Sequence, residues 1–155
     1  MESEIFEEFS KKILTKQDLA FCLDEIGTVE KFVFQKIELP LSEKVKGKIS
    51  EDFLIFIQEL ERKNLISKNP ERNKKFFENL KKHLLKIPQL KIEIAFEPKR
   101  NFLKKILDFF EKNFQQKVIL DVRVNPEIVG GIVFEFGGKI FDFSLSKKIE
   151  KMILG

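Results

Sequence analysis

The stretch KVILDVRVNPEIVGGIVFEFGGKIFDFSLSKKIEKMIL, residues 117–154, decides the fold of the C-terminal half of the chain. Its first part, Val118–Val124, alternates apolar residues with more polar ones, which is the two-residue period of a half-buried strand. Asn125-Pro126 ends this run, because proline fixes its own backbone and disfavours helix at the preceding residue. The sequence therefore predicts a strand followed by a turn.

A hairpin and a helix are predicted after this turn. The apolar runs Ile132–Phe136 and Ile140–Phe143 read as strands, and Gly137-Gly138 between them can adopt the positive backbone angles of a tight turn. Ser144 can cap a closing helix whose apolar residues share one side. Together these elements form a meander that ends in a helix.

One further strand and helix precede this stretch. Leu90–Phe96 again has the two-residue period, and Pro98 then introduces a segment that carries apolar residues at helical spacing as far as Phe114. The predicted order is strand, helix, three strands and helix. This order favours a small mixed sheet with helices on one face.

The N-terminal half has the three- and four-residue periodicity of amphipathic helices. The predicted helical segments are Glu2–Leu14, Gln17–Val33, a segment capped by Ser42, a segment capped by Ser50, and Pro70–Ile87. The run Phe53–Ile57 holds five consecutive apolar residues, which would point in all directions on a helix. We therefore expect this helix to be covered on nearly every side, either by its own domain or by another chain.

The period changes from helical to strand-like at Pro88, which predicts a domain boundary. On this interpretation residues 1–88 form an all-α helical bundle and residues 89–155 form a small mixed-sheet α/β domain. The predicted fold class is α+β.

Residues 125–136, NPEIVGGIVFEF, and 139–152, KIFDFSLSKKIEKM, carry a resemblance to a known family. Their order and spacing resemble the C-terminal signature of the delta subunit of F-type ATP synthases, which is called the oligomycin-sensitivity-conferring protein in mitochondria. The segment DFLIFIQELERKNLI, residues 52–66, also looks like a helix of that family. The residues at the signature positions are Asn125, where the family usually has an acid, and Pro126, Gly130, Gly131, Asp142 and Ser144.

The resemblance implies a non-catalytic stator, or peripheral stalk, subunit of a proton-driven ATP synthase. Its helical domain would bind the N-terminal helices of the alpha subunits, and its C-terminal domain would bind the C-terminal ends of the b subunits. We expect Phe6, Phe9, Phe53 and Ile57 to line the head-binding groove. The chain would be a monomer within this hetero-oligomer, peripheral at the cytoplasmic face of the bacterial cell membrane.

Composition agrees with a protein that is not inserted in a membrane. Charged residues make up 35% of the 155 residues, yet the net charge is only +4, so acids and bases are interspersed. No apolar run approaches the roughly 20 residues of a membrane-spanning helix. The acidic N-terminus MESEIFEEF is unlike a signal or transit peptide, and the single Cys22 excludes a disulfide framework within the chain. We expect a soluble protein.

No catalytic residue, metal site or cofactor is predicted. Gly130-Gly131 and Gly137-Gly138 lack the lysine and the hydroxyl residue that complete a phosphate-binding loop. One histidine, His83, and one cysteine cannot supply a tetrahedral zinc site.

A basic nucleic-acid-binding or adaptor module is the alternative interpretation. Its lysines and arginines would be Lys68, Arg72, Lys74, Lys75, Lys81, Lys82, Lys86, Lys99, Arg100, Lys104 and Lys105. The chain has no Trp or Tyr to stack on bases, and acids are mixed into the same helices. The stator interpretation, which involves no nucleic acid, is therefore favoured.

Overall fold

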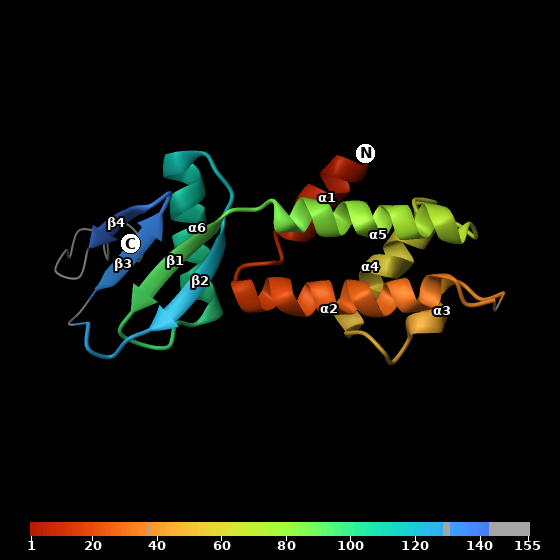
Figure 1. Cartoon of the computed structure of the whole chain (residues 1–155), viewed down its shortest axis with the longest axis horizontal. Helices are drawn as coiled ribbons and strands as arrows, with labels where there is room; N and C mark the ends of the chain where they lie inside the picture. The colour runs from red at the N-terminus through yellow and green to blue at the C-terminus, as the bar shows by residue number, and fades with distance from the viewer. Residues whose placement is uncertain (37, 129–130, 143–155) are drawn as a thin grey trace. The chain divides into compact units, whose positions relative to one another are not determined.

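The computed structural model describes residues 1–36, 38–128 and 131–142. The chain divides into two compact units (Figure 1). Unit 1 comprises Met1–Ser10 and Leu19–Lys86, and unit 2 comprises Lys11–Asp18 and Ile87–Gly155. The predicted α+β class is confirmed, since a helical region precedes a small unit with a mixed sheet.

Unit 1 is built from helices. In chain order they are α1 (Glu2–Ser10), α2 (Lys16–Val33), α3 (Leu41–Val45), α4 (Glu51–Arg62) and α5 (Pro70–Leu85). Two predicted helix starts are confirmed. The Ser50 hydroxyl accepts a hydrogen bond from the Phe53 amide at 3.3 Å, and the Asn69 side chain accepts from the amide of Glu71 at 3.0 Å.

Two glutamates join helices of unit 1 to one another. The buried Glu25 of α2 accepts a hydrogen bond from the backbone amide of Ser50, the residue that caps α4. Glu61 of α4 accepts from both the amide and the hydroxyl of Ser42, at 3.0 and 2.7 Å. Ser42 therefore does not cap a helix, because α3 begins one residue earlier, after Pro40, and the Ser42 hydroxyl is engaged by Glu61.

One other expectation for the helices is wrong. The first helix ends at Ser10 rather than at Leu14, because the buried residues Ile13 and Leu14 lie in the part of the chain that belongs to unit 2. Residues of this chain cover helix α4 on part of its surface only. Its residues Phe53, Phe56 and Ile57 are buried, but 47% of Ile55 is exposed.

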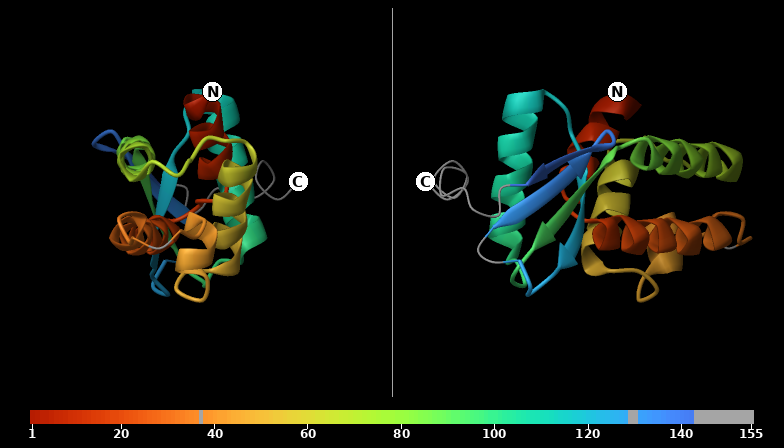
Figure 2. Two further views of the ribbon diagram at one scale, coloured as in Figure 1. Left: turned by 90° about the vertical axis from the view of Figure 1, so that its right-hand side faces the viewer. Right: turned by 60° about the vertical axis from the view of Figure 1, so that its left-hand side comes forward.

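The described residues of unit 2 form a four-stranded mixed sheet with helix α6 on one face (Figure 2). Its elements are β1 (Gln89–Ile94), α6 (Arg100–Phe114), β2 (Ile119–Val124), β3 (Ile132–Phe136) and β4 (Lys139–Asp142). The strand order is β2-β1-β3-β4, in which β1 pairs parallel to β2 and antiparallel to β3. Helix α6 supplies the crossover that parallel strands require.

The two faces of this sheet differ in chemistry. Leu90, Ile92 and Ile94 of β1 pack in a buried cluster with apolar residues of α6, β2 and β3. The alternate residues of β1 point to the other face. There Lys91 is paired in register with Asp121 and with Glu135, and Glu93 is paired with Arg123. The face away from α6 is therefore lined by charges of both signs.

The predicted hairpin is confirmed at Gly137-Gly138, whose φ angles are 59° and 76° and which joins Phe136 directly to Lys139. These angles suit glycine, since a Cβ atom is unfavourable in the left-handed region. We expect Gly138→Val to destabilise unit 2 by about 1–2 kcal/mol. Urea unfolding followed by circular dichroism measures this effect, and a variant as stable as the parent would contradict the turn geometry.

Candidate functional site

The four residues predicted to line a head-binding groove all lie in the core of unit 1. The exposed fractions are 6% for Phe6, 9% for Phe9, 2% for Phe53 and 0% for Ile57. The ring of Phe9 on α1 lies 5.8 Å from that of Phe53 on α4, measured between ring centroids. The structure therefore brings α1 and α4 together through aromatic contacts, with these side chains facing inward.

Phe6 belongs to a second aromatic contact of α1, with α5. Its ring centroid lies 5.3 Å from that of Phe76 and 5.6 Å from that of His83. The Nε2 atom of His83 lies 3.6 Å from an Oε1 oxygen of Glu7, also on α1. His83 is thus a packing residue between two helices, in agreement with its sequence context.

Asn125 anchors the turn of the C-terminal signature. Its amide donates to the carbonyl of Ile94 at 2.8 Å, and its side-chain NH₂ donates to the carboxylate of Glu93. The Asn125 side-chain oxygen accepts from the amide of Glu127 at 3.1 Å, which closes an Asx turn around the exposed Pro126. Three polar groups of one residue therefore fix the chain where it leaves β2.

Two of the remaining signature residues, Gly131 and Asp142, follow the turn and adjoin strands of the sheet. Gly131 is half-buried and directly precedes β3. Asp142 is the last residue of β4, and its backbone is paired with that of Val133. Gly130, Ser144 and the predicted closing helix lie outside the described residues. Gly131 and Asp142 thus lie next to β3, the strand between β1 and β4, whereas Asn125 is bonded to β1.

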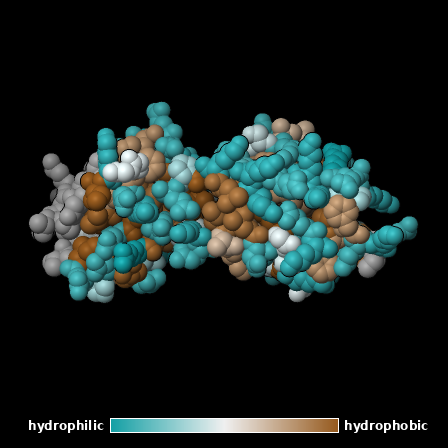
Figure 3. All heavy atoms as spheres, viewed as in Figure 1, coloured by the Kyte–Doolittle hydropathy of each residue, from teal (hydrophilic) through white to brown (hydrophobic). Residues whose placement is uncertain are grey.

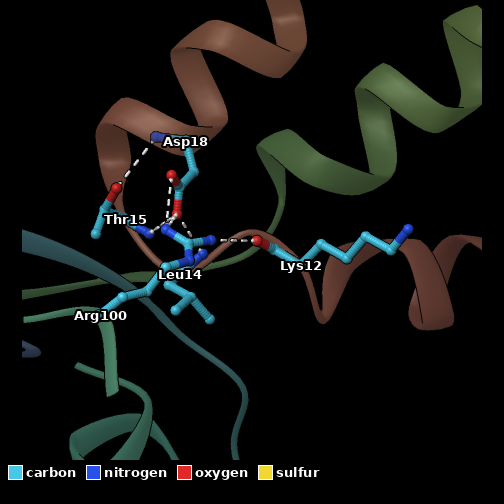
Figure 4. A network of polar contacts seen from close by, with 5 residues as sticks. All are labelled: Lys12, Leu14, Thr15, Asp18 and Arg100. Atoms are coloured by element: carbon cyan, nitrogen blue, oxygen red, sulfur yellow. Dashed lines mark hydrogen bonds and ion pairs between the residues drawn. The ribbon is translucent and has the colours of Figure 1, made fainter. Parts of the chain in front are cut away.

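A polar network that was not predicted ties the segment before α2 to α6 (Figure 4). Thr15 and Asp18 form a capping box, in which the Asp18 amide donates to the Thr15 hydroxyl and the Thr15 amide donates to the Asp18 carboxylate. The Leu14 amide donates to the same carboxylate oxygen at 2.9 Å. Arg100 donates to both Asp18 oxygens at 3.2 Å and to the Lys12 carbonyl at 3.0 Å.

This network changes the acidity of Asp18. Burial by itself would raise its pKa, but hydrogen bonds from the Leu14 amide, the Arg100 guanidinium and the Thr15 amide, together with the Arg100 charge, outweigh burial and lower the pKa. Since the folded pKa is depressed, the stabilisation is present above the ordinary pKa of about 4. This stabilisation is lost as the pH falls through the lowered pKa that Asp18 has in the folded protein.

The basic side chains of α5 are engaged in part with acids. Lys81 pairs with Glu30 of α2 at 2.8 Å, and Lys74 lies 3.8 Å from Glu78 one turn later on the same helix. On the face seen in Figure 3, hydrophilic residues cover most of α2 and α5. Two of the basic side chains of α5 are therefore paired with acids.

Chemically reactive groups are few in the part of the chain that the structure describes. Burial, with a contribution from the Glu25 carboxylate, raises the pKa of Cys22 to about 12, so this residue is a thiol at neutral pH. No group of three or more His, Cys, Asp or Glu side chains that could hold a metal ion is present among the described residues. Within those residues, no helix combines the length and the apolar character needed to cross a bilayer.

The described residues define an α+β protein in which a helical unit and a small mixed-sheet unit each have their own elements. The family model for the "ATP synthase delta (OSCP) subunit" matches residues 4–153. The chain belongs to this ATP synthase delta family.

Curated relatives agree with the family match. A protein named ATP synthase subunit delta from Francisella tularensis subsp. mediasiatica is 23% identical over 151 residues, which cover 97% of this chain and 85% of that protein. Its namesake from Clostridium kluyveri is 31% identical over 111 residues, covering 69% of this chain and 59% of the relative. The namesake from Nitrosomonas europaea is 33% identical over 76 residues, which cover 49% of this chain and 43% of that relative. The chain thus matches less than two thirds of the length of the last two.

Proposed function

We propose that this chain is a non-catalytic stator subunit of an F-type ATP synthase, linking the alpha subunits of the catalytic head to the b subunits of the peripheral stalk. The observation that carries this proposal is the family match over residues 4–153, which includes both compact units. A linking subunit needs two separate binding surfaces, and two units with separate cores supply them. The chain would act at the membrane-associated complex without inserting into the bilayer itself.

The functional division would fall near Pro88. Residues 1–88 would bind the head and residues 89–155 would bind the stalk. By holding both partners, the chain would resist the torque that proton flow exerts on the rotor, so that the head stays still while its sites change conformation. This task requires stable contacts rather than reactive side chains.

Unit 1 would bind an N-terminal helix of an alpha subunit in a groove formed by α1 and α4, by the helix-in-groove mode of recognition. Phe9 and Phe53 would form the floor of this groove, because they are buried and in contact across the two helices. The walls would come from less buried apolar residues of the same helices. These are the half-buried Ile5 and Leu54 and the exposed Ile55.

Ile55→Ser tests this groove. We expect it to weaken the binding of an alpha-subunit N-terminal peptide by about 1–2 kcal/mol, because an apolar anchor would be lost from the contact. Isothermal titration of the peptide into each full-length variant measures this effect. The matched control is Phe21→Ser, which removes an apolar side chain of α2 that is 59% exposed. If Phe21→Ser weakened binding and Ile55→Ser did not, the groove would lie elsewhere on unit 1.

Unit 2 would hold the ends of the b subunits, and its signature residues would shape it rather than contact substrate or metal. The hydrogen bonds of Asn125 to β1 support this role, since they fix the turn between β2 and β3. The charged face of the sheet suits a polar or charged partner surface. An apolar helix would leave Lys91, Glu93 and their neighbours without solvent or matching charges.

A further inference from the structure

The segment Lys11–Asp18 is close in sequence to α1, yet it belongs to unit 2. Its central residues are buried, with exposed fractions of 4% for Ile13, 8% for Leu14 and 8% for Thr15. A linker that only connected two helices would run over the surface. The burial of these three consecutive residues is unlike such a linker.

The segment lies along the outer edge of strand β2. Thr15 forms a parallel bridge with Leu120, and the Leu120 amide donates to the Leu14 carbonyl at 2.8 Å. One residue further along both chains, Lys16 and Asp121 form an ion pair with an N–O distance of 3.8 Å. The β2 edge, which would otherwise present unpaired backbone groups, is thus covered at this point by the chain's own N-terminal region.

Arg100 holds this segment from a third element. It is the first residue of α6, and its guanidinium spans the segment, with the Lys12 carbonyl on one side and the Asp18 carboxylate on the other (Figure 4). Hydrogen bonds between charged partners are the stronger kind, and a two-pronged contact also fixes geometry. Arg100 therefore fastens both ends of the stretch that pairs with Leu120.

We propose that Lys11–Asp18 is a strap of unit 2, fastened by the Arg100–Asp18 contact, which closes the β2 edge and makes an N-terminal segment part of the folding unit of the C-terminal sheet. Arg100 is a positioning residue, because it holds the strap in place through Asp18 and the Lys12 carbonyl. The stability of the β2 edge then depends on a segment that lies about 105 positions earlier in the sequence, since Thr15 pairs with Leu120.

The strap changes how the two units are connected along the chain. The chain passes between units after Ser10, after Asp18 and after Lys86, which makes three connections in place of one. In a stator, three connections would share the load that a single linker would otherwise bear. This consequence rests on the proposed function, whereas the strap itself does not.

Hydrogen exchange of the full-length protein, resolved by NMR, tests the strap. In Arg100→Gln we expect the amides of Leu14, Thr15 and Leu120 to exchange about tenfold faster or more, because a charge-assisted fastening has been lost. The amide of Ile92, in the interior of the sheet, should keep its rate. Asp18→Asn should reproduce the effect at the Leu120 amide, and there the double variant should add little to either single change because both weaken the Arg100–Asp18 contact.

The control is Arg72→Gln, which removes an exposed arginine of α5 and should leave all four amides unchanged. An equal acceleration at Ile92 in Arg100→Gln would overturn the proposal, since Arg100 would then stabilise the whole unit rather than fasten a strap. So would unchanged rates at Leu120 in both single variants. Neither result would bear on whether the chain binds alpha or b subunits.

Discussion

Phe9→Ala is expected to destabilise unit 1 by about 3–5 kcal/mol, because it removes a buried ring from a core that cannot fully collapse around the gap. The Phe9 ring lies 4.3 Å from that of Phe56 and 5.8 Å from that of Phe53, so the change removes one aromatic contact from each of these neighbours. Affinity for an alpha-subunit peptide should fall with it, since these rings would form the floor of the proposed groove. Urea unfolding followed by far-ultraviolet circular dichroism is suitable for a chain without Trp or Tyr.

The matched control is Phe21→Ala, because Phe21 is 59% exposed on α2. Its effect on stability should stay within about 0.5 kcal/mol. Equal losses in the two variants would contradict the burial on which the account of unit 1 depends. If the Phe9→Ala protein were as stable as the parent and bound the peptide with unchanged affinity, Phe9 would belong neither to the core nor to the groove.

Ile92→Ala should destabilise unit 2 by about 2–5 kcal/mol. Ile92 is 1% exposed and lies on the central strand β1, in register with Val122 on one side and Phe134 on the other. Binding of the b subunit should be lost with the sheet, whereas binding of the alpha peptide should persist, because the core of unit 1 contains none of these residues. Titration of each partner peptide against the variant measures both effects.

Lys91→Ala serves as the control for Ile92→Ala. It changes the preceding residue of β1, which is exposed on the opposite, charged face of the sheet. We expect a loss of stability of less than about 1 kcal/mol. A parallel loss of alpha and b binding in Ile92→Ala would indicate that the two units unfold together and do not bind their partners separately.

The sheet of unit 2 could be predicted because its signals are local. Alternation of apolar residues along β1, β2 and β3 gives both the strands and the face that is buried. Two adjacent glycines place the hairpin, and the structure shows positive φ angles at Gly137 and Gly138. The cap at Ser50 and the helix start at Pro70 were predicted for the same reason, since the signals that start a helix lie within two or three residues of it.

The strap could be predicted only in part. Thr15-Lys16-Gln17-Asp18 is a capping-box pattern ahead of an apolar run, and it could have shown that the first helix ends before Leu14. The pairing of Thr15 with Leu120 and of Asp18 with Arg100 has no sequence signal of this kind. Partners separated by 82 residues are brought together by the tertiary fold, which periodicity does not report.

Head-site residues illustrate a second limit of sequence patterns. An apolar residue at helical spacing is compatible both with a core and with a binding groove, and burial separates the two. The structure shows Phe6, Phe9, Phe53 and Ile57 as buried residues and Ile55 as an exposed one. The hydrophobic pattern of α4 could not distinguish these positions, because five apolar residues follow one another without a polar marker.

The most direct test of the central claim is purification of the affinity-tagged, full-length chain from its native membranes under mild detergent, with the bound subunits identified by mass spectrometry. The stator account predicts that alpha and b subunits are recovered together with the tagged chain. It also predicts that Ile92→Ala retains alpha but loses b. Recovery of the parent chain without either subunit, from membranes that contain the assembled synthase, would contradict the account.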